Sequence, residues 1–409
     1  MADAAVELLL LGTRHNPTPD TQRRIRDLLL NGVDGPRLLE LAHSHGVVPL
    51  LARTLNQAWS SETAGAPPPQ TGEITDLIDD LQASAGRIAR ENLRLTGALL
   101  ELTTRLEAAG VKAVAYKGPT LSLLLYGDPA LRTFDDLDFL VAPGQVTRAT
   151  EVLTDIGFEG WEDFTVGEAQ RLDGSRYARH FGHPERQLAV DLHWDLADPA
   201  WGFRTSELLD ALSAETIRLG GGEFRTLPIP ALLLALCVHG SKHEPLPWHQ
   251  LKWAVDVAGL MEFVPDWEAT MKQARRFRVE RATLLGLLCA HELVGVPLAP
   301  PVRQALSDNP GIRDAWTLIQ PRMFMPPHDG SRDELPTRQR LSLDLSLVDR
   351  RVDRVRFIVR RLLTPTPKDW EVVRLPSRLS VGYYLIRPVR LLVSKLLRVR
   401  RSGSSSEPG

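Results

Sequence analysis

The sequence TFDDLDFLV, at residues 133–141, alternates acidic and apolar side chains along a short segment. Successive side chains of a strand point to opposite faces, so Asp136 and Asp138 are expected to share one face while Leu137 and Phe139 point to the other. Two carboxylates on one face repel each other unless a cation lies between them. Mg²⁺ is a hard cation that prefers such oxygen ligands. The segment therefore predicts a β-strand that carries part of a metal site.

Strand and helix patterns alternate around this segment. Residues 73–109 have apolar side chains at helical spacing and predict a long amphipathic helix, whereas residues 111–116 predict a strand. Residues 145–154 predict a further helix. The segments 177–182 and 187–193 flank a short polar turn and predict an antiparallel hairpin. This order indicates an α+β fold, in which helices cover one face of a small mixed β-sheet.

Helical patterns flank this core on both sides, so the chain is expected to have several parts. We expect an N-terminal helical region over residues 1–110, with a Pro/Gly/Ser-rich linker at 60–72. The α+β core is expected over residues 111–228. A second helical region over residues 229–340 would close a cleft against the core. A basic helical tail with a disordered end is expected over residues 341–409.

The composition excludes several classes of protein. Lys and Arg number 49 against 51 Asp and Glu, so the net charge of −2 does not suit a polycation that coats nucleic acid. Two cysteines cannot form a disulfide framework or a four-cysteine zinc site, which fits a reducing compartment. The longest purely apolar run, residues 231–238, is far shorter than the roughly 18 residues of a spanning helix. The acidic N-terminus does not resemble a signal peptide. We therefore expect a cytoplasmic protein.

Positive charge gathers near the C-terminal end of the sequence. Residues 349–401 contain fifteen Lys and Arg against four Asp and Glu, a local balance of +11, so the rest of the chain carries −13. Arginines alternate with apolar residues over 350–363 and again over 387–401. Basic amphipathic helices suit an anionic membrane surface or an RNA backbone. They also form where a helix packs inward and leaves a charged face in water. Peripheral contact with an anionic membrane is thus one interpretation of the tail.

Asp191 is the candidate for a third carboxylate. It lies in the segment VDLHW at residues 190–194, between apolar neighbours in another expected strand. A third carboxylate beside Asp136 and Asp138 would suit in-line attack on a nucleotide α-phosphate, with metal ions holding the attacking and leaving oxygens. His193 lies two positions after Asp191 and shares its strand face. It either approaches the same site or packs beside Trp194.

The ordered set of motifs resembles the nucleotidyltransferase fold of the DNA polymerase beta superfamily. The set comprises Lys117-Gly118 before a helix, GDPALR at 127–132, the acidic strand and VDLHW at 190–194. Over roughly residues 35–260 the sequence is most similar to a bacterial family of uncharacterised nucleotidyltransferases, which is related to abortive-infection toxin transferases. Lys117-Gly118 stands where the superfamily usually has Gly-Ser or Gly-Gly.

This resemblance implies a nucleotidyltransferase that depends on Mg²⁺, with Mn²⁺ as a substitute. Such an enzyme moves a nucleoside monophosphate from an NTP such as ATP to a hydroxyl acceptor on a small molecule, a peptide or RNA. The implied catalytic residues, which are also the metal ligands, are Asp136, Asp138 and Asp191. The implied nucleotide-binding residues, which would orient the triphosphate, are Lys117, Gly118 and Arg132.

Several of these residues have a simpler interpretation. Lys117 also suits a surface loop, and Arg132 also suits an ion pair with Asp128 or Asp135. His239 and His243 stand four apart, as in half a metal site, but no Glu lies between them, so histidines in a helix packing interface are favoured. Lys242, between them, is a further candidate to reach the nucleotide.

Two other functions remain open from the sequence. The chain would be a catalytically inactive member of the family if it bound only a partner or a membrane through its basic tail. Alternatively, it would be a toxin-like transferase that modifies transfer RNA.

Overall fold

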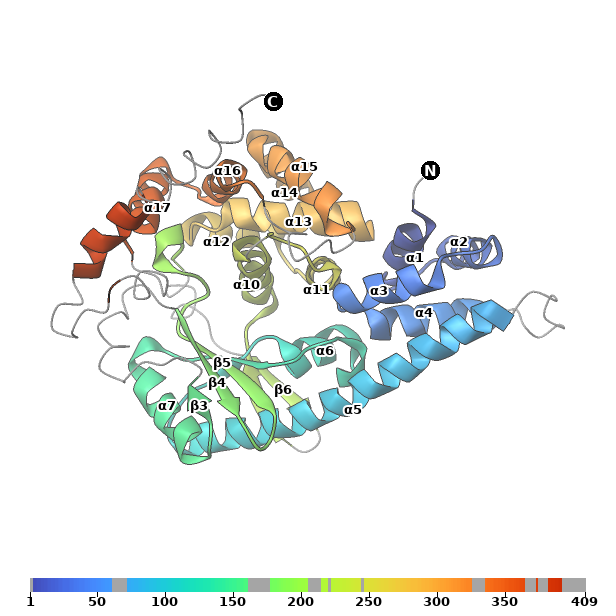
Figure 1. Cartoon of the computed structure of the whole chain (residues 1–409), viewed down its shortest axis with the longest axis horizontal. Helices are drawn as coiled ribbons and strands as arrows, with labels where there is room; N and C mark the ends of the chain where they lie inside the picture. The colour runs from blue at the N-terminus through green and yellow to red at the C-terminus, as the bar shows by residue number, and fades with distance from the viewer. Residues whose placement is uncertain are drawn as a thin grey trace, which may run out of the picture.

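The computed structural model of the chain, shown in Figure 1, describes residues 3–60, 72–160, 177–204, 215–219, 222–243, 246–325, 335–364, 373 and 382–391. Seven strands within these residues form one mixed sheet in the order β3-β4-β5-β2-β1-β7-β6. The strands are β1 (Val114–Ala115), β2 (Leu137–Leu140), β3 (Glu159–Gly160), β4 (Ala178–His183), β5 (Leu188–His193), β6 (Glu215–Leu219) and β7 (Gly222–Thr226). The expected mixed sheet and α+β fold are confirmed.

The centre of the sheet is the pairing of β2 with two partners that come from different parts of the chain. β2 pairs antiparallel with β1 and parallel with β5, and the parallel register places Asp138 beside Asp191. β5 continues into the antiparallel hairpin with β4, in which His180 pairs with Asp191. The sequence pattern predicted this hairpin, and the structure confirms it.

One face of the sheet is covered by α5 (Gly72–Ala108) and α7 (Val146–Asp155). Leu137 and Phe139 of β2 point to this side and belong to a core shared with these two helices. Alternation then directs Asp138 to the opposite face, as the sequence predicts. That second face is turned toward the helices that follow β7, above the sheet in Figure 1.

A second and larger core joins the two helical regions of the chain. Its N-terminal helices are α1 (Ala4–Gly12), α2 (Pro19–Leu30), α3 (Gly35–Ser44) and α4 (Val48–Ser60). Its later helices are α10 (Ile229–Lys242), α11 (Leu251–Met261), α12 (Trp267–Arg276), α13 (Glu280–Val294), α14 (Pro300–Asp308), α15 (Gly311–Met323) and α16 (Thr337–Leu347). Residues 206 positions apart meet here, where the backbone amide of Leu251 donates to the Nδ1 atom of His45.

α5 connects the two cores because it is long enough to reach both. Leu77 and Leu81, near its start, are buried in the helical core. Leu95 to Leu106, in its second half, are buried against the sheet. The apolar stripe predicted from the sequence over residues 73–109 therefore exists, but its two halves face different partners.

Several elements differ from the sequence expectations. The strand expected over 111–116 is reduced to Val114–Ala115, because the Lys112 amide donates to the Gln145 side chain and not to a neighbouring strand. α14 and α15 lie within the helical region expected over residues 229–340, although the sequence pattern does not give their bounds. Most of the linker expected at 60–72 and the end of the tail expected to be disordered lie outside the described residues.

The tail begins with a helix as expected. α17 (Arg351–Leu363) follows α16 closely, and residues 383–391 form a further helical segment. The rest of this second basic helix, which the sequence predicts to continue to about residue 400, lies outside the described residues. Of the helices that the structure describes, none has the length and hydropathy to cross a membrane.

Candidate metal centre

Three side chains from two adjacent strands lie on the face of the sheet that is turned away from α5 and α7. Asp138 of β2 and Asp191 of β5 are register partners, and His193 lies two positions further along β5. One ligand atom from each of the three lies within 4.8 Å of the others. Asp136, just before β2, lies outside this group. The structure thus brings two of the three predicted carboxylates together and adds His193.

Asp138 is buried between two cationic or polar donors. Lys117 Nζ lies 2.6 Å from Asp138 Oδ1, and His193 Nε2 lies 3.1 Å from the same oxygen. Burial alone would raise the pKa of Asp138, but Lys117 and His193 outweigh burial and hold this pKa below its ordinary value. Burial lowers the pKa of His193 despite the neighbouring carboxylate. We therefore expect an ionised Asp138 beside a neutral imidazole at neutral pH.

The other two acidic residues have different surroundings. Burial, together with the charge of Asp138, raises the pKa of Asp136 to about 7, although Lys117 opposes the shift. Asp191 is only partly buried, and its Oδ1 lies 2.6 Å from His180 Nδ1. This hydrogen bond raises the pKa of His180. The neighbouring negative charge expected from the sequence is therefore present. Together with burial, it favours the protonated form of Asp136.

Sequence reasoning missed His180. The hairpin register alone would have found it, because residue 180 of β4 is opposite residue 191 of β5. Its exposed ring covers the outer side of Asp191.

Lys117 lies in the turn between β1 and α6 (Gly118–Tyr126), and this turn determines where its side chain points. Gly118 has a φ of +56°, a left-handed conformation that favours glycine, and it lies close to the Asp136 carbonyl oxygen. Pro119 then fits the first turn of α6. The turn buries Lys117 against Asp138, with its Nζ 5.0 Å from the centre of the Tyr116 ring. Lys117 is therefore part of the cluster and not of the solvent-exposed surface.

Arg132 is bound elsewhere. Its Nε and Nη2 atoms donate to the two carboxylate oxygens of Asp256 on α11, at 2.9 to 3.1 Å, and both side chains are buried. Asn92 of α5 donates to the Arg132 carbonyl oxygen. Asp128 instead caps the short helix η1 (Pro129–Leu131). The ion-pair partner of Arg132 is thus Asp256, 124 positions away, and not Asp128 or Asp135, the two partners considered from the sequence.

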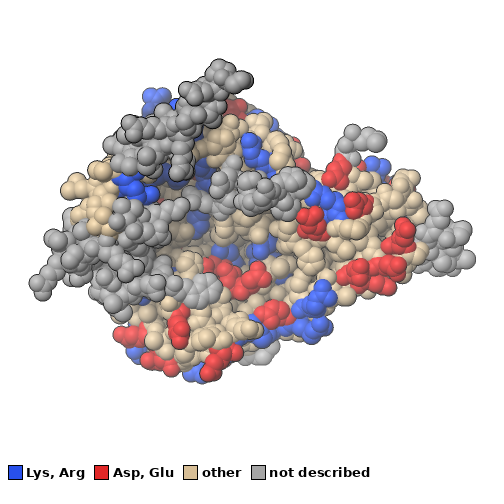
Figure 2. Space-filling view, viewed as in Figure 1, with Lys and Arg blue, Asp and Glu red and all other residues tan. Residues whose placement is uncertain are grey.

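Basic side chains from α10 and α11 complete the surroundings of the acidic cluster. Lys242 Nζ donates to the Leu196 carbonyl oxygen at 2.5 Å and lies 4.1 Å from the Tyr177 ring centre. Burial, and then the charge of Lys117, lower the pKa of Lys242 to about 7. Burial also lowers the pKa of Lys252, which feels the charges of Asp135 and Asp136. In Figure 2, acidic side chains line the lower edge of a hollow, and basic side chains lie deeper inside it.

His239 and His243 lie in an aromatic group and not in a metal site. The rings of His239, His243 and His249 lie 4.4 to 5.3 Å from the Trp253 ring. Burial lowers the pKa of His239, and it lowers the pKa of His243 to about 3. Neutral rings in edge-on and tilted contact fit the packing role favoured from the sequence.

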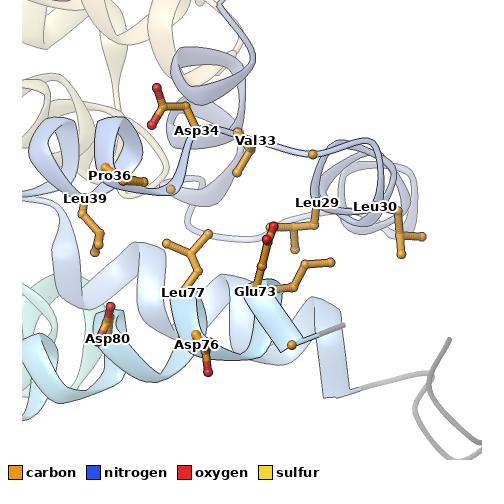
Figure 3. A pocket seen from close by; sticks show the side chains of 14 residues that line it. Leu29, Leu30, Val33, Asp34, Pro36, Leu39, Glu73, Asp76, Leu77 and Asp80 are labelled. Carbon is orange, nitrogen blue, oxygen red and sulfur yellow. The ribbon is translucent and has the colours of Figure 1, made fainter. Parts of the chain in front are cut away.

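A separate cavity of about 940 Å³ lies where the α2–α3 turn meets the start of α5 (Figure 3). Its charged lining residues are all acidic: Asp34, Glu73, Asp76 and Asp80. Such a lining repels a polyphosphate, so the hollow beside the sheet is the better candidate for a nucleotide.

The donor set of the cluster fits a divalent cation. Carboxylate oxygens are the preferred ligands of Mg²⁺ and Mn²⁺, and an imidazole is compatible with Mn²⁺. His193 Nδ1 is buried and makes no hydrogen bond in the described structure. Burial, and then the charge of Asp138, raise the pKa of Asp136, and a bound cation would favour its ionised form. These residues therefore suit a metal ion.

Comparison with known proteins finds one family whose sequence profile matches the chain. A sequence profile for a family described as an uncharacterised nucleotidyltransferase matches residues 31–295, more than half of the chain. No curated protein matches the chain. Among solved structures, an antigenic nucleotidyltransferase-like protein from Paracoccidioides brasiliensis is 16% identical, with a TM-score of 0.34. That similarity covers 52% of this chain and 92% of the other.

Proposed function

Because the chain belongs to the family of uncharacterised nucleotidyltransferases, we propose that it transfers a nucleoside monophosphate from an NTP, such as ATP, to a hydroxyl acceptor. Pyrophosphate would be the leaving group, and the acceptor would be a small molecule, a peptide or an RNA. One observation carries the proposal: Asp138 and Asp191 are register partners on parallel strands, and their ligand atoms lie within 4.8 Å of each other and of His193.

In this proposal Asp138, Asp191 and Asp136 would hold Mg²⁺ or Mn²⁺. A bound divalent cation would polarise the phosphate and lower the pKa of the acceptor hydroxyl. His193 holds Asp138 in place through its Nε2 contact, and His180 does the same for Asp191. Such supporting contacts fix the direction of a ligand oxygen.

The triphosphate would lie between the sheet and the helices. Lys117 would orient it, and the backbone amide of Gly118 at the start of α6 would face a phosphate oxygen. Lys242 and Lys252 add positive charge from α10 and α11. Arg132 already donates two nitrogens to Asp256, so we propose that it positions α11 against the core and does not contact phosphate.

The decisive experiment incubates the protein with Mg²⁺, each labelled NTP and an extract from a host cell, and asks which molecules become labelled. Asp138→Asn removes the negative charge of the central ligand but keeps its shape. We expect it to reduce labelling at least about a thousandfold, which corresponds to roughly 4 kcal/mol of transition-state stabilisation. Asp135→Asn is the matched control, because Asp135 is the exposed neighbour of the cluster. Equal labelling by wild type and Asp138→Asn would disprove the proposed site.

A second variant separates the role of Lys117 from that of the carboxylates. Lys117 Nζ and a metal ion would compete for Asp138 Oδ1. Lys117→Met should therefore bind Mn²⁺ alone about tenfold more tightly, while NTP binding in the presence of metal weakens about tenfold or more. Calorimetric titration measures both constants. If both constants stay at their wild-type values, Lys117 has no role in either step.

A further inference from the structure

The outer face of α17 is apolar, although it faces water. The exposed apolar residues are Val352, Val355, Val359, Leu362 and Leu363. Their spacing of three or four residues, with Leu363 directly after Leu362, places them along one side of the helix. Between 40% and 62% of the surface of each is exposed. The opposite side of α17 packs onto the protein through Phe357 and Asp353, which are buried.

This arrangement differs from the inward-packing amphipathic helix that is the simpler interpretation of the basic tail. A helix that merely packs inward turns its apolar side to the core and its charged side to water. α17 instead has a buried side and, separately, an exposed apolar stripe. An exposed contiguous apolar surface of this kind marks an interaction site.

Arginines lie along both edges of the stripe. Arg351 is exposed on one edge, and Arg356 and Arg360 are exposed on the other. A central apolar stripe bordered by cationic side chains is the pattern of helices that lie in a membrane interface. The apolar residues would enter the acyl region while the guanidinium groups remain level with the phosphates.

A cavity beside the stripe supplies a second, independent feature. Its volume is about 550 Å³, and it lies between α17 and the segment around η4 (Pro199–Trp201). Its charged lining residues are Arg204, Arg278, Arg356, Arg360 and Asp353. Asp353 pairs with Arg278 at 3.1 Å and with Arg356 at 3.3 Å. Arginines thus outnumber carboxylates among the residues that line this cavity, which suits an anion.

The cavity also opens onto the apolar stripe. Val355 and Val359 line it together with Arg356 and Arg360. The buried Nε atom of Arg278 makes no hydrogen bond in the described structure. A ligand that combines a phosphate with an adjoining apolar chain would satisfy both parts of this surface at once.

The helical segment at 383–391 lies against the end of α17 and also exposes apolar side chains. Arg387 donates through Nε and Nη2 to the Arg361 carbonyl oxygen at 3.1 and 2.9 Å, which ties this segment to the last turn of α17. Leu385 is 77% exposed and Val389 is 60% exposed. In Figure 1, α17 lies at the outer edge of the helical layer, away from α1 to α4.

We propose that α17 and residues 383–391 dock the protein onto an anionic phospholipid bilayer, with a lipid phosphate in the arginine cavity and the apolar stripe among the acyl chains. Charge complementarity identifies the occupant: arginines border apolar side chains here, and an anionic bilayer presents phosphates above hydrocarbon. An RNA would pair with the arginines but would leave the valines and leucines in water, so RNA suits this surface less well.

Cosedimentation of the full-length chain with vesicles tests the proposal. One vesicle contains phosphatidylcholine alone, and the other contains equal parts of phosphatidylcholine and phosphatidylglycerol. We expect binding to the phosphatidylglycerol vesicles, weaker binding to phosphatidylcholine, and loss of binding as salt rises, because salt screens the arginines. Val355→Asp combined with Val359→Asp should weaken binding about tenfold or more. Arg356→Glu combined with Arg360→Glu should also weaken it about tenfold or more, since each basic residue contributes about fivefold.

Matched controls lie on other exposed helix faces. Leu93→Asp on α5 changes a residue that is 59% exposed, and Arg148→Glu on α7 changes an exposed arginine. Both should bind vesicles as wild type does. NTP binding should be unchanged in all variants, because none of these residues belongs to the metal cluster. Each variant should still unfold cooperatively on heating, although Arg356→Glu/Arg360→Glu should be less stable because Arg356 pairs with the buried Asp353.

Three results would overturn the inference. They are equal binding of wild type to both vesicles or to neither, retention of binding by Val355→Asp/Val359→Asp, and preferential binding to a structured RNA that competes the protein off the vesicles.

Discussion

Arg132 and Asp256 form a buried ion pair that joins the sheet core to α11 through two parallel hydrogen bonds. A buried pair of this kind contributes little net stability relative to apolar residues, yet loss of one partner leaves a buried charge unpaired. The pair therefore fixes the position of α11 relative to the sheet core.

Asp256→Ala should lower the free energy of unfolding by about 3–5 kcal/mol, because Arg132 would stay buried without a partner. The double variant Arg132→Met/Asp256→Leu should recover most of that loss. Urea unfolding measures the free energy of unfolding of the single and the double variant. Glu151→Ala, which breaks the exposed pair with Arg148, is the control and should change stability by less than about 0.5 kcal/mol.

The same double variant tests the role of Arg132. If Arg132 only positions α11, the double variant should bind NTP as wild type does. A folded double variant that loses NTP affinity would instead restore Arg132 as the triphosphate contact that the sequence resemblance implies.

Lys242 gives a prediction for pH. Its pKa in the folded chain is about 7, below the roughly 10.4 expected in the unfolded chain. Between these values the unfolded state holds more protons, so this group makes stability rise with pH. Below pH 7 both states are protonated, and the dependence disappears.

Lys242→Met should therefore be more stable than wild type at pH 7. Its advantage should shrink by about 2 kcal/mol between pH 7 and pH 9 as the wild-type lysine loses its proton in the folded state. Urea unfolding at the two pH values measures the difference between the proteins, in which the other titrating groups cancel. A constant difference would show that Lys242 is as well solvated as an ordinary surface lysine.

At the scale of elements, the contact between α10 and α13 depends on glycine. Gly240 of α10 and Gly286 of α13 both face the buried Trp248 ring. A Cβ atom built on either glycine would lie within 2.8 Å of a ring carbon. The ring is rigid and donates through Nε1 to the Ser241 hydroxyl, so it has little freedom to move.

Gly240→Ala should destabilise the chain by about 1–3 kcal/mol through overpacking. Gly97→Ala is the matched control, because Gly97 lies in the middle of α5 with no atom within 4 Å of its built Cβ. There the same change should stabilise by about 0.5–1 kcal/mol through helix propensity alone. Thermal unfolding of the two variants should shift in opposite directions. If the unfolding temperatures of both variants rise, the side chains around Trp248 can rearrange to accept the added methyl group.

Elements with a local pattern were predictable from the sequence. The alternation at 133–141 predicted β2 and the direction of Asp138, because a period of two needs no knowledge of the rest of the chain. The hairpin of β4 and β5 followed for the same reason. The shared face expected for Asp136 stays a prediction, since this residue precedes the strand. β1 was overestimated because the ladder ends where Gln145, a residue of a later segment, takes the Lys112 amide.

Contacts between distant segments were not predictable in detail. The sequence indicated that Asp191 belongs with Asp136 and Asp138, and the structure places it beside Asp138, but their roles as metal ligands stay a prediction. Lys252 and the Asp256 partner of Arg132 come from α11, more than a hundred residues after the acidic strand. No periodicity carries information over that separation, so only the folded chain reveals them.

At the scale of the whole molecule, the two cores bury different halves of α5. The core of the sheet lies entirely within residues 95–224 and includes Leu95, Leu99, Leu102 and Leu106 of α5. The boundary at residue 110, expected from the sequence, would cut these four leucines away from the sheet that they cover. Full burial of four such side chains contributes about 6–12 kcal/mol, which is comparable to the total stability of a domain.

A fragment of residues 111–228 should therefore be unfolded, whereas a fragment of residues 86–228 should unfold cooperatively in urea. Far-ultraviolet circular dichroism along the urea titration compares the two. The longer fragment differs from the shorter only by the half of α5 that packs on the sheet, so a cooperative transition in the shorter one would show that the sheet is stable without this cover. The functional core of the protein would then begin after α5, as the sequence suggested, and the long helix would serve only to attach the N-terminal helices.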